Sequence, residues 1–173
     1  PEDPATFNGT VVVEWLNVSG GLDANPDWMY LADEILRGGY AWVGVSAQHI
    51  GVEGGPVAVA VGAAGDLAGK GLKNMVPERY GELSHPGDAY AYDIYTQVSR
   101  ALRQSGADGP MGGLEPEVII AAGESQSAFA LTTYANGVQP LTREFDAFFV
   151  HSRGGAALPL GEPGGGVGIA DSI

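Results

Sequence analysis

The sequence predicts an α/β fold, a doubly wound and mostly parallel sheet with helices on both faces. Short apolar runs rich in β-branched residues alternate with stretches of helical period, the order expected of parallel strands joined by crossover helices. The runs are apolar at nearly every position, as strands covered on both faces are. Glycine makes up 28 of the 173 residues and clusters where these stretches end, which favours tight turns over disorder.

The first strand and the first helix are predicted at the start of the chain. Residues 10–15 read Thr-Val-Val-Val-Glu-Trp, bounded by an Asn-Gly pair before the run and by the loop 17–21 after it. The Asn-Pro-Asp sequence at 25–27 predicts a helix start, with Asn25 as the capping residue and proline in the first turn. A Gly-Gly pair at 38–39 predicts the end of this helix.

The second strand is predicted over residues 40–46, and a long segment without a regular period follows it. Residues 51–85 begin with a stretch rich in Gly, Ala and Val, which indicates a surface excursion or a small cap element. Long segments of this kind in compact domains are usually functional or mobile. His49, just after the strand, is predicted to be a loop residue.

The second half of the chain predicts two more helices and two more strands. An apolar stripe at helical spacing indicates a helix over residues 90–104, capped by Asp88. A third strand is expected over 117–122, a short helix ended by an Asn-Gly pair over 127–136, and a fourth strand over 145–150.

Length and charge limit the classes of protein to consider. The 173 residues suit one domain, predicted as a partial one whose residues 154–173 form a glycine-rich loop at a truncated end. With 8 basic and 21 acidic residues the net charge is −13, which disfavours binding to nucleic acid. No apolar run is long enough to span a membrane. The sequence fits a soluble protein, either cytoplasmic or secreted through a signal upstream, and leaves the oligomeric state open.

Metal and thiol chemistry are not expected. The chain has no cysteine, so it can form neither a disulfide framework nor a thiolate metal site. Its three histidines lack metal-ligand spacing, and no cofactor motif is present.

The chemistry-bearing stretch is Gly123-Glu124-Ser125-Gln126-Ser127, where the third strand runs directly into a helix. This is the setting of a nucleophile elbow, in which a strained turn presents a serine hydroxyl above the sheet. Small residues must stand two positions before and after the serine, because strand and helix pass close together there. Ser127 stands where the usual pattern has glycine. The alternative is that Ser125 is an ordinary helix cap.

Four segments in this order resemble the bacterial family of alpha/beta hydrolase domain-containing proteins. They are Glu-Trp-Leu-Asn-Val-Ser-Gly-Gly at 14–21, Ser-His-Pro-Gly-Asp at 84–88 running into Tyr-Asp-Ile-Tyr at 92–95, the elbow at 123–127, and Val-His-Ser-Arg-Gly at 150–154. Members of this family are longer than this chain, so the resemblance implies a fragment. It also implies that the strands lie in the spatial order second, first, third, fourth.

The resemblance implies a serine hydrolase that cleaves a small-molecule ester or related acyl bond without a cofactor. Ser125 would attack the carbonyl carbon, and a histidine oriented by an acid would take its proton. That acid and histidine are expected beyond the fourth strand, outside this chain. The oxyanion hole would use the backbone N–H of Gln126 and one from the loop 17–21, at Ser19 or Gly20.

Other polar residues near the elbow keep more than one interpretation. His151, at the end of the fourth strand, could be the base, a residue lining the site or a structural histidine. Glu124 is expected to be a buried carboxylate beside the elbow, with Arg153 as one candidate partner. Arg153 could instead bind a substrate carboxylate or hold its loop. His85 is expected either in a turn or in contact with the site from a cap region.

Two rival functions remain. One is a binding protein that kept the hydrolase fold and lost catalysis, since a fold alone does not determine function. The other is a nucleotide-binding α/β domain, which the missing G-x-G-x-x-G after the first strand disfavours.

Overall fold

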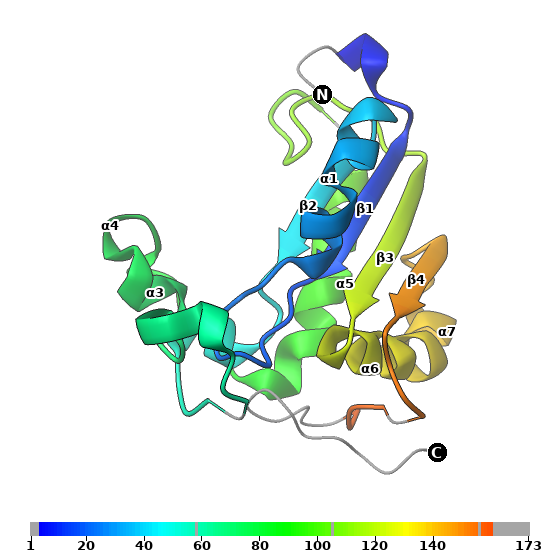
Figure 1. The fold of residues 1–173 in the computed structure, drawn as a ribbon. Coiled ribbons are helices and arrows are strands. Elements are labelled where there is room, and N and C mark those ends of the chain that lie inside the picture. Colours follow the sequence, from blue (N-terminus) through cyan, green and yellow to red (C-terminus); the bar gives the residue numbers. More distant parts are fainter. Residues whose placement is uncertain (1–3, 58, 105, 156, 161–173) are drawn as a thin grey trace.

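The computed structural model describes residues 4–57, 59–104, 106–155 and 157–160. Four parallel strands form one sheet in the order β2-β1-β3-β4, which confirms the predicted fold class and strand order (Figure 1). The strands are β1 (Thr10–Trp15), β2 (Ala41–Val45), β3 (Val118–Glu124) and β4 (Ala147–His151). Because all four are parallel, their carboxyl ends meet at one edge of the sheet, where binding sites of such folds lie.

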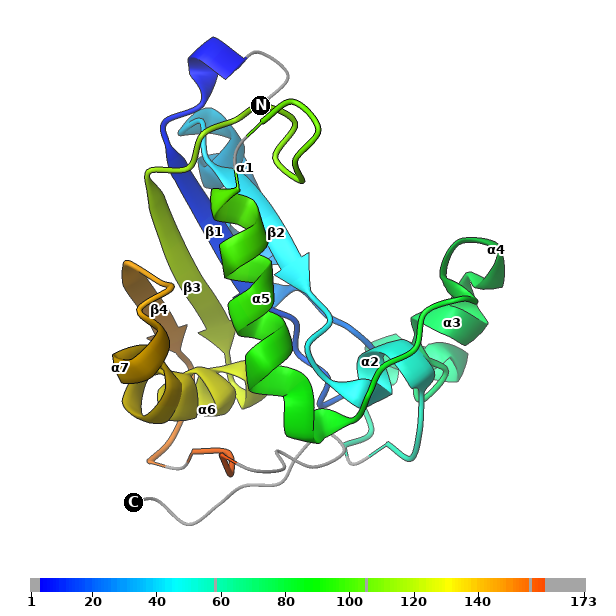
Figure 2. The same ribbon diagram turned by 180° about the vertical axis from the view of Figure 1, so that it is seen from behind.

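Helices cover both faces of this sheet. Helix α1 (Pro26–Arg37) lies on one face, and α5 (Ala91–Arg103) crosses the other, with α6 (Gln126–Thr133) on the side of α5 (Figures 1 and 2). None of the described helices combines the length and the apolar character needed to cross a bilayer.

The main core lies between the sheet and α5. Val11, Val13 and Trp15 alternate along β1 and are fully buried toward this face. The Tyr95 hydroxyl donates a hydrogen bond of 2.6 Å to the Val13 carbonyl, and its ring stacks on Phe145 with centroids 4.9 Å apart. Burial raises the pKa of Tyr95 well above its ordinary value, so this hydroxyl stays a donor.

The opposite face of β1 carries a buried carboxylate, Glu14, that holds the start of α1. Its Oε1 accepts the Asp27 N–H at 2.9 Å, and its Oε2 accepts the Trp28 N–H at 3.0 Å and the Trp42 indole N–H at 2.9 Å. Asn25 occupies the N-cap position and a proline follows it, as predicted, but the Asn25 side chain makes no capping hydrogen bond. A carboxylate from a neighbouring strand therefore satisfies the free N–H groups of the first turn.

The segment predicted as an excursion or cap contains several short helices. They are α2 (His49–Glu53), the 3-10 stretch η2 (Gly62–Leu67), α3 (Gly71–Met75) and α4 (Pro77–Tyr80). His49 is thus the first residue of a helix and not a loop residue. Helices of four to six residues show no apolar period, which explains why the sequence pattern missed them.

Two other predicted boundaries differ from the structure. Asp88 does not cap α5; it opens a 3-10 turn, η3 (Asp88–Tyr90), and its carboxylate accepts the His49 N–H at 2.6 Å. The Asn-Gly pair at 136–137 does not end the helix after the elbow. The chain continues through a π turn, η4 (Tyr134–Val138), into α7 (Gln139–Thr142), which ends at the left-handed Arg143. One more 3-10 turn, η1 (Pro4–Thr6), precedes β1.

We expect Glu14→Gln to lower the free energy of unfolding by about 1–3 kcal/mol, because an amide cannot accept from all three donors with both of its heteroatoms. The matched control is Glu34→Gln on the exposed side of α1, where only a surface ion pair with Arg37 is lost. That control should change stability by less than about 0.5 kcal/mol. Urea unfolding measures both, and equal effects would contradict the capping role of Glu14.

Candidate active site

Ser125 occupies a strained turn between β3 and α6, as the sequence predicts for an elbow. Its backbone angles are φ 55° and ψ −113°, a combination that a serine adopts only when its surroundings enforce it. It stands at the N-cap position of α6, yet its hydroxyl makes no capping hydrogen bond. The hydroxyl is therefore not engaged in the role that the alternative interpretation gave it.

Strand and helix pass close together on either side of this turn. A Cβ added to Gly123 would lie 2.9 Å from Leu131 Cδ1 and 3.1 Å from both the backbone carbon and the Cβ of Ser127. Gly123 is thus required by contact, and the fully buried Ser127 is small enough to fit beside it.

Backbone and side-chain hydrogen bonds hold the elbow. The Ser125 N–H donates to the His151 carbonyl at 3.2 Å. This bond directly follows the last pair of the β3–β4 register, Glu124 with His151. The buried Gln126 side chain donates to Gln48 Oε1 at 2.7 Å, and the same oxygen accepts the Trp15 indole N–H at 3.1 Å. The Gln126 backbone N–H has no partner among the described residues.

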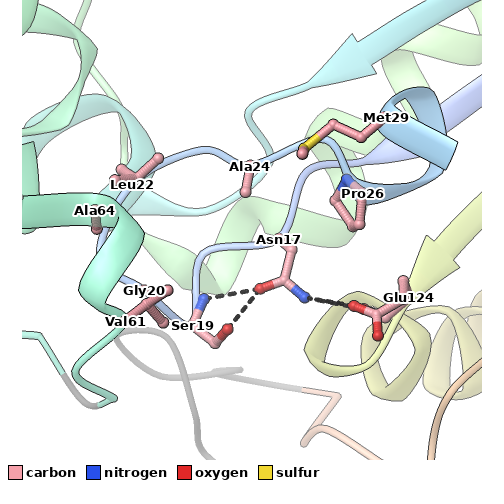
Figure 3. A pocket seen from close by; sticks show the side chains of 10 residues that line it. All are labelled: Asn17, Ser19, Gly20, Leu22, Ala24, Pro26, Met29, Val61, Ala64 and Glu124. Atoms are coloured by element: carbon pink, nitrogen blue, oxygen red, sulfur yellow. Dashed lines mark hydrogen bonds between the residues drawn. The ribbon is translucent and has the colours of Figure 1, made fainter. Parts of the chain in front are cut away.

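The loop after β1 is joined to the elbow by Asn17. Its Nδ2 donates to the Glu124 carbonyl at 3.0 Å and reaches the Glu124 carboxylate at 3.5 Å (Figure 3). Its Oδ1 accepts both the backbone N–H and the hydroxyl of Ser19. The Ser19 N–H is therefore engaged inside the loop, whereas the Gly20 N–H has no partner in the described part of the chain.

The segment around η2 lies directly on this loop. The Gly69 N–H donates to the Gly21 carbonyl at 2.6 Å. A Cβ on Gly20 would meet Val61 Cγ2 at 3.2 Å, and one on Gly21 would meet Val57 Cγ2 at 2.6 Å. The segment predicted as an excursion or cap thus covers the loop that faces the elbow.

His151 is paired with a buried carboxylate. Its Nε2 lies 2.5 Å from Asp27 Oδ1, with the Asp27 side chain 1% exposed and the His151 side chain 30% exposed. Its Nδ1 lies 3.0 Å from the Ser152 hydroxyl. Because Asp27 begins α1 and His151 ends β4, this pair ties the helix to the edge strand, 124 residues apart in the sequence.

The other predicted site residues, Glu124, Arg153 and His85, each have a hydrogen-bond partner within the protein. Glu124 is half-buried, so the prediction of a buried carboxylate was wrong, and its backbone carbonyl accepts from Asn17. Arg153 Nη1 donates to the Gly154 carbonyl at 2.6 Å. His85 uses both ring nitrogens, since Nδ1 accepts the Gly87 N–H and Nε2 lies 3.0 Å from the Ala47 carbonyl, which requires a proton on Nε2. His85 therefore binds its own turn to the end of β2. Most of the predicted loop 154–173 lies outside the described residues.

Sequence reasoning missed Asn17, Asp27 and Gln48 as parts of this site. Each is a polar residue next to a strand end or helix start, and each is buried in the structure. Their partners lie 107, 124 and 78 residues away in the sequence, so only their position at the carboxyl edge of the predicted sheet could have indicated them. Among the residues that the structure describes, no acidic or histidine cluster has the arrangement of a metal site.

The fold and the elbow together define an α/β hydrolase-fold protein, with the serine turn at the carboxyl edge of a parallel sheet. The sequence matches the family described as alpha/beta hydrolase domain over residues 1–172, and the chain belongs to this family. No curated protein and no solved structure gave a match.

We expect Gly123→Ala to lower the free energy of unfolding by about 1–3 kcal/mol, as overpacking of a tight contact does. The Ser127 backbone cannot move aside as a flexible side chain could. Gly62→Ala is the control, since its added Cβ would meet nothing within 4 Å. Thermal unfolding compares the two, and equal melting temperatures would contradict the close approach at the elbow.

Asp23, in the loop after β1, should make stability depend on pH. Burial raises its pKa from 3.8 to about 6, although the Ser46 hydroxyl donates to Oδ2 and opposes this. Oδ1 is buried and has no partner among the described residues. Because the folded protein holds this proton more tightly than the unfolded chain, the contribution of Asp23 is fully present below about pH 4 and is lost as the pH rises through about 6.

Asp23→Asn is neutral at every pH and should escape that loss. The difference in unfolding free energy between Asp23→Asn and the original protein should shift in favour of the variant by about 1–3 kcal/mol between pH 4 and pH 7. Denaturant unfolding at each pH measures it, with Asp33→Asn on the exposed side of α1 as control. Parallel curves for Asp23→Asn and the original protein would rule out a buried, proton-holding Asp23.

Proposed function

We propose that the protein is a serine hydrolase that cleaves an ester or a related acyl bond through an acyl-serine intermediate. The observation that carries this proposal is the strained Ser125 between β3 and α6, with a hydroxyl that does not cap the helix it precedes. Strain of this kind in a non-glycine residue persists where the surroundings fix it for a purpose such as presenting a nucleophile.

The oxyanion hole in this proposal consists of the backbone N–H groups of Gln126 and Gly20. Both lack partners among the described residues, whereas the Ser19 N–H is engaged by Asn17. The Gln126 N–H also belongs to the N-terminus of α6, where developing negative charge is favoured. Asn17, bonded to Ser19 and to Glu124, would keep the two donors at a fixed separation.

The reaction would proceed in two halves. Ser125 Oγ bonds to the carbonyl carbon while a histidine takes its proton, and the carbonyl oxygen becomes an oxyanion held by the two N–H groups. Collapse breaks the bond to the leaving oxygen, which receives the proton from the histidine. A water molecule then attacks the acyl-serine by the same steps, and releases the acid and the free serine.

His151 and Asp27 would act as positioning residues in this scheme. Both ring nitrogens of His151 have partners, Asp27 and Ser152, and its carbonyl accepts the Ser125 N–H. The proton acceptor would then be a different histidine, which in this fold follows the fourth of these strands along the chain. Arg153 would hold the turn after β4, and His85 the turn before α5.

Fluorophosphonate labelling of the full-length protein tests the proposal. We expect one adduct, located on Ser125 by mass spectrometry and absent from Ser125→Ala, because only an activated serine reacts at neutral pH. Ser127→Ala serves as the matched control, since Ser127 is fully buried two residues away and should not affect labelling. A folded protein whose Ser125 stays unlabelled would favour the binding-protein alternative.

A further inference from the structure

An apolar hollow lies beside the proposed oxyanion donor Gly20. Its volume is about 250 Å³, and its walls come from the loop after β1, the first turn of α1, the region of η2 and the elbow (Figure 3). Among the residues that line it are Asn17, Ser19, Gly20, Met29, Val61 and Glu124.

The chemistry of these walls favours an uncharged, apolar occupant. Leucine, alanine, proline, methionine and valine side chains form most of the lining. Of the three polar side chains, Asn17 accepts the Ser19 hydroxyl and its amide reaches the Glu124 carboxylate at 3.5 Å (Figure 3). An anionic group would also meet Glu124 and a chain with a net charge of −13.

The size of the hollow limits the length of that occupant. An apolar cavity of about 150 Å³ accepts a benzene molecule, which has six carbon atoms. In proportion, the 250 Å³ found here would accept about ten non-hydrogen atoms.

The position of the hollow relative to the reaction indicates which part of an ester it would hold. Gly20 lines the hollow. When its N–H binds the carbonyl oxygen of an ester, one of the two substituents on the carbonyl carbon would therefore point into the hollow. The leaving oxygen must receive a proton from the histidine, which in the proposed mechanism follows β4 along the chain. The strand β4 lies across β3 from β1, and the loop after β1 lines the hollow. The leaving group therefore points elsewhere, and the acyl chain enters the hollow.

We propose that this hollow is an acyl-binding site for uncharged apolar chains of up to about ten non-hydrogen atoms, and that Met29 sets its length. The inference rests on the proposed function. Met29, on the first turns of α1, is 72% exposed and lines the hollow, so its side chain can be changed without disturbing the core (Figure 3).

The test uses p-nitrophenyl esters with acyl chains from two to fourteen carbons and the full-length protein. We expect kcat/KM to rise by about threefold to fourfold for each methylene that the hollow accepts, and to fall once about ten non-hydrogen atoms are exceeded. Met29→Ala should move the maximum to longer chains by about one to three carbons, because three side-chain atoms are removed. Met29→Trp should move it to shorter chains.

Tyr30→Ala is the control, because Tyr30 is the next residue on α1, is 77% exposed and does not line the hollow. It should leave the chain-length profile unchanged. A second series keeps an acetyl group and varies the alcohol, and the Met29 variants should not alter its order. If they change the alcohol series and not the acyl series, the hollow holds the leaving group and the inference is overturned.

Labelling of Ser125 separates the two levels of the proposal. Labelled Ser125 with a chain-length profile indifferent to Met29 would overturn the acyl-site inference and leave the hydrolase function in place. Unlabelled Ser125 in folded protein would overturn both.

Discussion

The hydrogen bonds from the buried carboxylate of Glu14 to the start of α1 are the interaction on which the carboxyl edge of the sheet depends. They fix where α1 begins relative to β1 and β2. That position brings Asp27 within reach of His151 and turns Met29 toward the loop after β1. Burial raises the pKa of Glu14, and the Asp27 charge nearby adds to this, while the three hydrogen bonds oppose it. The three hydrogen bonds of this buried acid therefore set geometry, because each one fixes a donor of α1 or β2 relative to β1.

Local patterns were sufficient for most of the fold. The β-branched runs of β1 and β3 and the apolar stripe of α5 each carry their period within a single element, so the order of strands and helices could be predicted from them. The short helices between 49 and 80 could not, because helices of four or five residues are stabilised by contacts with distant segments. The position of the α1 cap, Asn25, was predicted, but the acceptor of the first-turn N–H groups was not, since that acceptor, Glu14, lies on a strand.

The candidate site likewise contains one part that a local sequence pattern indicated and one part that only the folded sheet brings together. The elbow around Ser125 is a local motif, with its small residues at fixed spacing, and the sequence alone indicated it. The residues that hold it are brought together by the sheet: Asn17 from the end of β1, Gln48 from beyond β2, and Asp27 from α1. None belongs to a motif, because what they share is a place at one edge of the fold and a buried hydrogen bond.

The contact between the η2 region and the loop after β1 has a consequence for how this protein can diverge. Val61 rests on Gly20, and Gly69 is bonded to Gly21, so one surface both shapes the apolar hollow and supports a proposed oxyanion donor. Substitutions in the two segments would not be independent in their effects, since residues in contact couple energetically. A lineage that acquires a new substrate through the η2 region would therefore need compensating changes in the loop, and the two segments should evolve as one unit.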